Sequence, residues 1–319
     1  MSRPCSVSPE PLARVLSLVE ARDPEAVRAA AGLGSPLGPE LSLAASEAIA
    51  PAGRRGGAFI VVTGIDKAGK ETQVFNPARL PGVRALLEFV EGLGYGTMGV
   101  RQPEYDFLSG QLIRSYLGLD SGCSISGRLP RGSAWVLWSL NRALLNRPVA
   151  AWLSGDGRAV VSKRWGESNL AYHAPQGVSP ERILSLERGF VQPDLFVVLD
   201  LDPEVSARRA GGAGDAFESR LRLLSAAREI LRDLGRYFPD SEVAVVDASA
   251  DPASVNGAVL DAVRSFLRRR ARGRPRRWPR TSRGRIRRGL TWRRRRHPPA
   301  PPAVSRRGRT PKPAWGRPS

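Results

Sequence analysis

The sequence predicts an α/β fold in which helices cover both faces of a five-stranded parallel sheet. Two observations carry this prediction. Five short runs of apolar and β-branched residues alternate with helix-sized segments within residues 57–270. The first run also leads directly into the glycine-rich sequence GIDKAGK (residues 64–70), and a helical pattern follows it. A strand, a glycine-rich turn and a helix in this order are typical of phosphate-binding α/β proteins.

The five expected strands lack the alternation of polar and apolar residues that marks a strand with one exposed face. Continuous apolar runs of this length indicate parallel strands that are buried on both sides. The runs occupy residues 58–63, 96–101, 158–162, 195–201 and 243–248.

Helical periodicity is clearest in five segments between and after these runs. Pro77 and Pro81 are expected to interrupt the helix that follows the glycine-rich sequence, because proline removes an N–H group and clashes one turn back. The five helical segments occupy residues 79–91, 135–153, 180–190, 217–237 and 252–269.

Residues 1–56, which precede the expected α/β domain of residues 57–270, are rich in Ala, Pro and Gly. They contain one clear amphipathic helix, SPEPLARVLSLVEA, with Ser8 as its expected cap, and a second short helix is expected from Asp23 onward. The region is interpreted either as a docking arm or as a poorly ordered leader, and its composition favours the leader.

The basic residues gather at the other end of the chain. The formal net charge is +20, but 21 of the 50 Lys and Arg residues lie in residues 268–319, which contain no Asp or Glu. The other 267 residues carry 29 basic and 30 acidic side chains, a balance that is usual for enzymes. Residues 271–319 are rich in Arg and Pro and are expected to be disordered. The basic segment of residues 268–319 is interpreted in one of two ways. It either binds nucleic acid without sequence preference, or it is a passive extension.

Cysteine and histidine are too scarce for a metal centre. Cys5 and Cys123 make no disulfide framework and no thiolate site, and His173 and His297 make no histidine site. A reducing cytoplasm is therefore the expected compartment. No apolar run approaches the ~20 residues that a membrane helix needs, and no secretory signal is evident at the start, so no membrane contact is expected.

The glycine-rich sequence matches a phosphate-binding loop from Gly64 to Lys70. The glycines let the backbone curl around an anion, the helix start adds partial positive charge, and the lysine reaches the outer phosphates. The alternative is a plain strand-to-helix turn, and the flanking strand and helix favour phosphate binding. The residues expected to bind ATP are Gly64, Ile65, Asp66, Lys67, Ala68, Gly69, Lys70, Glu71 and Thr72.

Six sequence blocks span most of residues 57–270. They are FIVVTGIDKAGKETQ, VRQPEYDFLSGQLIRSYL, LWSLNRALL, VVSKRWGESNLAYH, QPDLFVVLDLDPEVSARR and DAFE. Together, and in this order, they resemble the thymidylate kinase family. In that family the second block carries an Arg-x-Pro, the third an Asp-Arg pair, and the fourth Asp-Arg-Tyr with a later Ala-Tyr.

This resemblance implies a P-loop nucleoside monophosphate kinase fold and transfer of the γ-phosphoryl group of ATP to dTMP, giving dTDP. It also implies Mg²⁺ as cofactor and a homodimer. Such transfers depend mainly on positioning and on neutralisation of charge.

On the donor side, the resemblance gives roles to four residues. Lys70 would hold the β and γ phosphates, and Lys67 would face the phosphoryl group in transfer. Arg208 and Arg209 would begin a lid that continues into AGGAG (residues 210–214) and closes over ATP.

On the acceptor side, the resemblance gives roles to five residues. Asp66 would contact the sugar hydroxyl, and Tyr172 would lie near the sugar and help to exclude ribonucleotides. Arg101 and Arg164 would bind the acceptor phosphate, and Arg142 the thymine edge. Lys67, Lys70, Arg164 and Arg209 are therefore the expected catalytic residues.

Four positions depart from the family pattern: Glu71, Asn141, Lys163 and Ala216. Glu71 stands where a hydroxyl binds magnesium, and Lys163 stands where an acid precedes the arginine. The two side chains are expected either to pair with each other, or to divide the work, with Glu71 as a magnesium ligand and Lys163 supplying charge to phosphates. The alternative function is a nucleotide-binding protein that has lost efficient catalysis and works through its basic tail.

Overall fold

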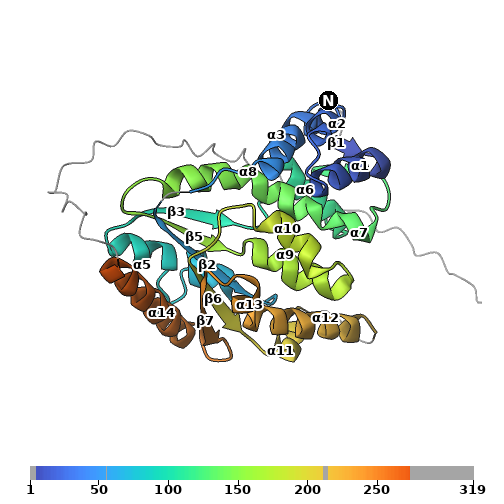
Figure 1. Ribbon diagram of the computed structural model, residues 1–319. Helices are drawn as coiled ribbons and strands as arrows, with labels where there is room; N and C mark the ends of the chain where they lie inside the picture. The colour runs from blue at the N-terminus through green and yellow to red at the C-terminus, as the bar shows by residue number, and fades with distance from the viewer. Residues whose placement is uncertain (1–4, 55, 211–214, 274–319) are drawn as a thin grey trace, which may run out of the picture. The chain divides into compact units, whose positions relative to one another are not determined.

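The computed structural model describes residues 5–54, 56–210 and 215–273. Its centre is a sheet of five strands that are all parallel, in the order β3-β5-β2-β6-β7 (Figure 1). Every residue of the central strand β2 is buried, because β2 has a strand on each edge and helices on both faces. The five predicted strands are thus confirmed as β2 (Ala58–Gly64), β3 (Gly96–Arg101), β5 (Arg158–Lys163), β6 (Leu195–Asp200) and β7 (Glu242–Asp247).

Helices cover both faces of this sheet, as the sequence predicts. One face carries α4 (Lys70–Phe75), α5 (Leu86–Gly92) and α14 (Pro252–Gly273). The helices associated with the other face are α8 (Val136–Leu153), α9 (Gly166–His173), α10 (Pro180–Glu187), α12 (Asp215–Arg232) and α13 (Leu234–Tyr237).

The helix after the glycine-rich loop is short, as its prolines predict. It ends at Phe75, and Asn76 follows in a left-handed conformation with φ of 40°. The Asn76 side chain donates to the backbone oxygen of Val83 at 2.9 Å and accepts from the backbone N–H of Leu80 at 2.9 Å. The helix expected over residues 79–91 therefore begins only at α5.

The amino-terminal region differs from a poorly ordered leader. It forms β1 (Cys5–Val7), α1 (Pro9–Glu20), α2 (Glu25–Ala31) and α3 (Leu37–Ile49). The predicted apolar face of α1 is buried, and α1 and α3 lie against α8, on the side of α8 away from the sheet (Figure 1). Side chains of all three helices belong to the same buried core as the strands.

The two cysteines form a disulfide, which corrects the expectation that they make no disulfide framework. Strand β1 pairs in parallel with β4 (Cys123–Ile125), and this register places Cys5 opposite Cys123 with 4.4 Å between their Cα atoms. The two residues are 118 positions apart, so the pairing depends on how the amino-terminal region packs. Two cysteines this far apart in the sequence do not by themselves indicate that they pair.

The remaining elements connect these layers. They are α6 (Leu108–Tyr116), α7 (Arg131–Ala134), a 3₁₀ turn (Ala174–Gln176) and α11 (Pro203–Ala210). None of the described helices is both long enough and apolar enough to cross a membrane.

The expected boundary at residue 270 falls within α14. Arg270 pairs with Asp194 at 2.8 Å and donates to the backbone oxygen of Gly57, so it belongs to the folded body. The predicted lid residues 211–214 and the tail from residue 274 onward lie outside the described residues, and the predicted disorder of that tail therefore stays a prediction.

Candidate active site

The glycine-rich loop turns sharply between β2 and α4. Gly64 ends β2 with φ of 145°, and a Cβ atom there would lie 2.6 Å from the backbone oxygen of Leu199. Gly69, with φ of 91°, and Lys67, with φ of 60°, also have left-handed backbone conformations. A bend of this kind before a helix lets successive N–H groups face one anion, so the loop can cradle phosphates.

Lys70 begins α4 and places its ammonium group inside the loop. Nζ donates a hydrogen bond to the backbone oxygen of Ile65 at 2.6 Å, and the residue is 7% exposed. Burial lowers the pKa of Lys70 well below its usual value, and the charge of Arg164 lowers it further. The phosphates of a nucleotide would favour the charged form, because an opposite charge stabilises a buried ammonium group.

Glu71 holds two cations beside the loop. Its Oε2 lies 2.8 Å from Nζ of Lys163, and its Oε1 accepts a hydrogen bond from Nε of Arg101 at 2.9 Å. Burial disfavours the ionised carboxylate, but hydrogen bonds from Lys163 and Arg101 outweigh this effect and lower the pKa of Glu71. The pairing of Glu71 with Lys163, one of the two predicted arrangements, is therefore the one present.

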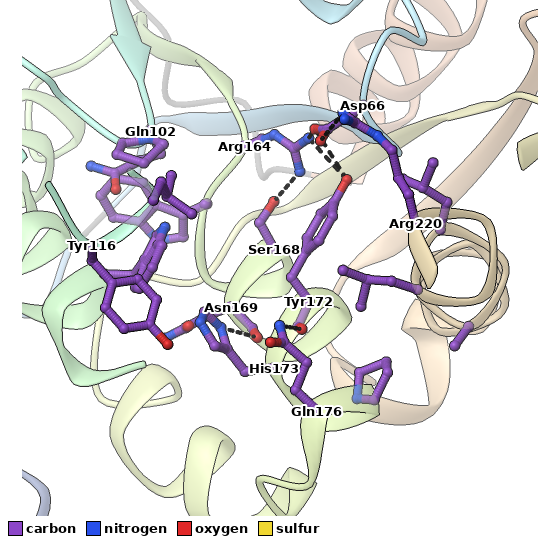
Figure 2. A pocket seen from close by; sticks show the side chains of 18 of the residues that line it. Asp66, Gln102, Tyr116, Arg164, Ser168, Asn169, Tyr172, His173, Gln176 and Arg220 are labelled. Atoms are coloured by element: carbon purple, nitrogen blue, oxygen red, sulfur yellow. Dashed lines mark hydrogen bonds and ion pairs between the residues drawn. The ribbon is translucent and has the colours of Figure 1, made fainter. Parts of the chain in front are cut away.

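A cavity of about 1060 Å³ opens beside the loop (Figure 2). Its walls come from the segments on either side of α6, from α8 and α9, and from α12. Asp66 belongs both to the loop and to the cavity wall, so the two sites adjoin at this residue.

Arg164 connects β5 to the junction of loop and cavity. It follows the strand with φ of 65°, and its N–H donates to the backbone oxygen of Val62 at 3.0 Å. Its Nη2 donates to Oδ1 of Asp66 at 2.7 Å, and the hydroxyl of Tyr172 donates to the same oxygen at 3.2 Å (Figure 2). Arg220 of α12 adds a second cation 3.8 Å from Asp66.

The charge states at this junction follow from these contacts. Burial opposes the ionisation of Asp66, but the charges of Arg164 and Lys70 outweigh it and lower the pKa of its carboxyl group. Burial raises the pKa of Tyr172, so its hydroxyl stays protonated and donates. The junction thus holds one carboxylate, one neutral hydroxyl and two guanidinium groups.

Two side-chain amides face the cavity in fixed orientations. Nδ2 of Asn169 donates to Glu187 at 2.7 Å and to Ser139 at 3.0 Å. Oε1 of Gln102 accepts from Arg142 at 3.3 Å. These bonds leave two buried atoms, Oδ1 of Asn169 and Nε2 of Gln102, without a hydrogen-bond partner among the described residues. Both residues line the cavity, and these two atoms, one acceptor and one donor, are themselves buried in its wall.

Glu187 determines these orientations from α10. Arg142 donates through Nε to Oε2 at 2.8 Å and through Nη2 to Oε1 at 3.1 Å, and both side chains are almost completely buried. Ser139 donates to Oε1 at 2.6 Å. A bidentate pair with further hydrogen bonds is the arrangement in which buried charges are tolerated.

Aromatic rings form the other end of the cavity. The ring of Trp138 meets Tyr116 at 5.7 Å and His173 at 4.7 Å between centroids, both edge to face. Burial lowers the pKa of His173 to about 4, so the imidazole is neutral at neutral pH. This end of the cavity is uncharged and suits a flat, partly apolar group.

The structure brings together four of the five predicted acceptor-side residues. Asp66, Arg142, Arg164 and Tyr172 line the cavity, whereas the lining residues do not include Arg101, which pairs with Glu71. The described residues thus give no geometric support for Arg101 as a ligand of the acceptor phosphate.

On the donor side, the start of the predicted lid reaches the loop. Arg209 donates to the backbone oxygen of Lys67 at 3.1 Å. Arg208 instead pairs with Glu204 on its own helix at 3.0 Å. Only Arg209 of these two arginines contacts the loop, which fits its expected place near the phosphates.

Sequence reasoning missed two charged residues that left a signal. Glu187 shares a face of the expected helix at 180–190 with Ile183 and Phe190, and a carboxylate on an apolar face indicates a buried partner. Arg220 lies four residues after Ala216, which stands where the family has a lid arginine.

Two uncharged residues, Gln102 and Asn169, were also missed. Single amides near the ends of strands and helices are common, so neither carries a recognisable pattern. Asn141, which departs from the family's acid, fixes the same wall by accepting from the backbone N–H of Glu104 at 2.8 Å and donating to its oxygen at 2.9 Å.

The sequence also matches a known protein family. The sequence profile of the family described as thymidylate kinase matches residues 62–258, more than half of the chain. The chain belongs to the thymidylate kinase family. It is therefore a nucleoside monophosphate kinase by family, with the corresponding P-loop fold, and membership implies phosphoryl transfer from ATP.

Individual thymidylate kinases match about two thirds of the chain. The chain is 30% identical over 216 residues to a "Probable thymidylate kinase" of Thermococcus onnurineus (strain NA1), covering 66% of this chain and 100% of that protein. It is 28% identical over 219 residues to a "Thymidylate kinase" of Arabidopsis thaliana, covering 69% of this chain and 75% of that protein. It is 30% identical over 222 residues to a "Thymidylate kinase" of Symbiobacterium thermophilum, covering 67% and 96%.

The usual magnesium position carries a carboxylate in place of a hydroxyl. Mg²⁺ takes oxygen ligands, and a P-loop offers it the hydroxyl after the lysine. Here that position holds Glu71, whose two oxygens already bind Lys163 and Arg101. The described residues also contain no cluster of three or more His, Cys, Asp or Glu that could hold a metal. Glu71 as a metal ligand stays a prediction, in which the metal would share the carboxylate with one or both of these cations or displace them.

Proposed function

We propose that this protein phosphorylates dTMP to dTDP with ATP as the phosphoryl donor. The observation that carries the proposal is the pair of fixed amides in the cavity beside the P-loop, Oδ1 of Asn169 as acceptor and Nε2 of Gln102 as donor. These two groups are complementary to the base edge of thymine and uracil, which supports dTMP as the phosphoryl acceptor.

Thymine and uracil have a donor at N3 and acceptors at O2 and O4. Asn169 would accept the N3–H, and Gln102 or Arg142 would donate to O4. Cytosine offers the reverse, an acceptor at N3 and a donor at N4, so it would leave buried groups unpaired. Such a mismatch costs about 1–3 kcal/mol for each unpaired group, enough to reject a base about ten-fold or more.

The junction at Asp66 suits the sugar and the acceptor phosphate. Arg164 and Arg220 would bind phosphate oxygens, and Asp66 and Tyr172 would contact the sugar. Lys70 would hold the β and γ phosphates of ATP, with Lys67 and Arg209 near the group in transfer. Catalysis would follow from orientation and charge neutralisation. Mg²⁺ is proposed as a companion of ATP, with no side chain of this protein assigned to it.

The alternative is a nucleotide-binding protein without efficient catalysis. Only the replacement of the magnesium hydroxyl by Glu71 and of the acid by Lys163 favours it. We also propose a homodimer, from the resemblance, and nonspecific nucleic-acid contact through residues 268–319, from the charge. The cytoplasmic location expected from unpaired cysteines loses its basis, because Cys5 and Cys123 are bonded.

One coupled assay of ATP consumption with dTMP, dUMP, CMP and UMP tests the proposal. We expect dTMP to be the best acceptor, dUMP weaker, and CMP and UMP poor. Turnover that is equal for CMP and dTMP would contradict base recognition by the two amides. Binding of ATP and dTMP by calorimetry without turnover would support the alternative.

A further inference from the structure

The cavity has one wall, α6 with its flanking segments, that is held by a part of the chain outside the family match. Tyr105 precedes α6, Tyr116 ends it and Leu117 follows it, and all three line the cavity. The match to the family begins at residue 62. The region that holds this wall, here called the amino-terminal arm, is residues 5–49, with β1, α1, α2 and α3.

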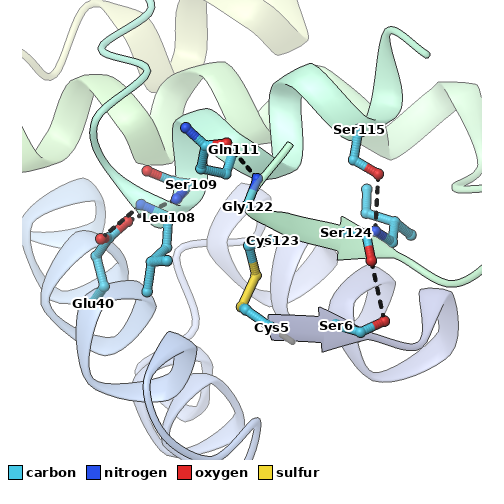
Figure 3. Close-up of a disulfide and its surroundings, with 11 residues drawn as sticks. Cys5, Ser6, Glu40, Leu108, Ser109, Gln111, Ser115, Gly122, Cys123 and Ser124 are labelled. Atoms are coloured by element: carbon cyan, nitrogen blue, oxygen red, sulfur yellow. Dashed lines mark hydrogen bonds between the residues drawn. A yellow bond between two sulfur atoms is a disulfide. The ribbon is translucent and has the colours of Figure 1, made fainter. Parts of the chain in front are cut away.

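The arm contacts the start of α6 through one carboxylate. Oε2 of Glu40, on α3, accepts from the backbone N–H of Leu108 at 2.9 Å, and Oε1 accepts from that of Ser109 at 2.7 Å (Figure 3). These are the first two residues of α6, and Phe107 before them supplies no side-chain cap. A carboxylate that binds two free N–H groups at a helix start stabilises that helix through hydrogen bonds and charge.

The arm contacts the segment after α6 through a strand and a disulfide. Strand β1 pairs with β4, and Cys5 is bonded to Cys123 (Figure 3). The segment is tied back to α6 as well, since Gln111 accepts from the N–H of Gly122 at 2.7 Å and Ser115 accepts from that of Ile125 at 2.9 Å. The cavity residues Tyr116 and Leu117 lie in sequence between the two points of attachment.

An α6 of nine residues has little stability of its own, because helices shorter than ~12–15 residues are marginal without tertiary contacts. Its position therefore depends on α8, on one side, and on the arm at both ends. The loop that precedes α6 also carries Gln102, whose free donor is part of the proposed base site.

We propose that the amino-terminal arm is a clamp that positions the acceptor wall, with Glu40 as its positioning residue and the Cys5–Cys123 bond as its second attachment. The clamp sets the affinity for the nucleoside monophosphate and leaves the ATP loop unaffected, since β2 and α4 lie outside the clamped segment. This inference rests on the proposed function for the identity of the acceptor, and on contacts within the chain for the clamp itself.

The test compares Glu40→Ala with Glu40→Gln and with the matched control Glu25→Ala. Glu25 belongs to the same arm, but it contacts only Arg28 on its own helix, at an exposed site. For Glu40→Ala we expect KM for dTMP to rise about ten-fold, as for a lost helix cap, with kcat and KM for ATP within about two-fold of the parent. Glu40→Gln keeps one acceptor oxygen, so its KM for dTMP should lie between those of the parent and of Glu40→Ala. The control Glu25→Ala should match the parent.

Hydrogen exchange gives a second readout that does not depend on turnover. Amides of residues 108–117 should exchange faster in Glu40→Ala than in Glu25→Ala, while amides of α4 should not change. Reduction of the disulfide, or Cys5→Ser, should speed hydrogen exchange in residues 119–126. It should also raise KM for dTMP, as Glu40→Ala does.

Several results would overturn the clamp. They are equal rises in KM for dTMP and for ATP in Glu40→Ala, unchanged exchange in α6, and identical KM values for the oxidised and reduced protein. A parent protein that phosphorylates none of the four monophosphates would instead overturn the proposed function. Exchange in α6, together with calorimetric binding of dTMP to each variant, would still decide the clamp.

Discussion

Lys70 shows how much of the loop's chemistry depends on a single side chain. The ammonium group is buried against its own loop, and this burial lowers its pKa. In the absence of an anion, the charged form of the buried lysine therefore costs free energy. Its contribution to the fold is therefore expected to be small and its contribution to phosphate binding large.

Lys70→Ala should weaken ATP binding by ten-fold or more, on the order of 1.4 kcal/mol, because the phosphates lose their buried cation. Titration with ATP measures the affinity, and circular dichroism and thermal melting check that the fold is retained. Unchanged affinity would mean that the loop is only a strand-to-helix turn.

Glu71 and Lys163 form an ion pair beside the phosphate-binding loop. Their side chains are 2.8 Å apart and partly exposed, so the pair itself is worth at most ~1 kcal/mol of stability. Glu71→Thr would leave Lys163 and Arg101 without their carboxylate, and Lys163→Asp would set two carboxylates side by side.

We predict that each of these two changes lowers the rate of phosphoryl transfer and that the double variant recovers much of it. The double variant restores the hydroxyl and the acid of the family pattern, which is the physical reason for recovery. A double-mutant cycle on kcat/KM measures the coupling. Strictly additive losses would refute a catalytic role for the pair, as would a parent without activity.

At the scale of elements, three helices meet at one carboxylate. Glu187 of α10 binds Ser139 and Arg142 of α8 and Asn169 of α9, and these contacts orient the amide that faces the base. A complete buried ion pair of this kind adds little to the stability of the fold. The loss of one partner is costly, because it leaves an uncompensated buried charge. The junction thus links helix packing to acceptor recognition.

Glu187→Gln should lower the free energy of unfolding by about 3–5 kcal/mol, because Arg142 stays buried without a counter-charge. Chemical denaturation measures this loss. The matched control is Glu181→Gln, an exposed carboxylate on the same helix, which should change stability by less than ~0.5 kcal/mol. Equal effects of the two changes would show that the buried pair does not matter for stability.

At the scale of the whole molecule, positive charge is separated from the catalytic body. The first 267 residues are nearly neutral, and the excess lies in residues 268–319. The body extends to the end of α14, since Arg270 pairs with Asp194. A test of the tail must therefore leave this helix intact.

Truncation after Gly273 should remove steeply salt-dependent DNA binding, because Arg and Lys in the tail would release counterions from phosphates. Kinase activity should not change. Binding isotherms at several salt concentrations measure the slope for both proteins. If the truncated protein binds DNA as well as the full chain, the tail is not responsible.

The sequence by itself determined the architecture and the loop. Runs such as 58–63 and 195–201 predict buried parallel strands because their apolar pattern is local, and the glycines at 64 and 69 mark a bend that few other residues allow. Pro77 and Pro81 predicted a broken helix for the same reason, since their effect lies in their own backbone. The prediction of a parallel α/β sheet with a P-loop depends only on such local constraints.

Only the tertiary structure decided which distant residues meet. The disulfide joins residues 118 positions apart, Glu40 caps a helix that begins 68 residues later, and Arg101 lies against Glu71. The free amide atoms of Gln102 and Asn169 exist because buried partners fix the other halves of both groups. Such contacts depend on the packing of whole elements, and a single sequence records the residues of a contact but not the distance between them.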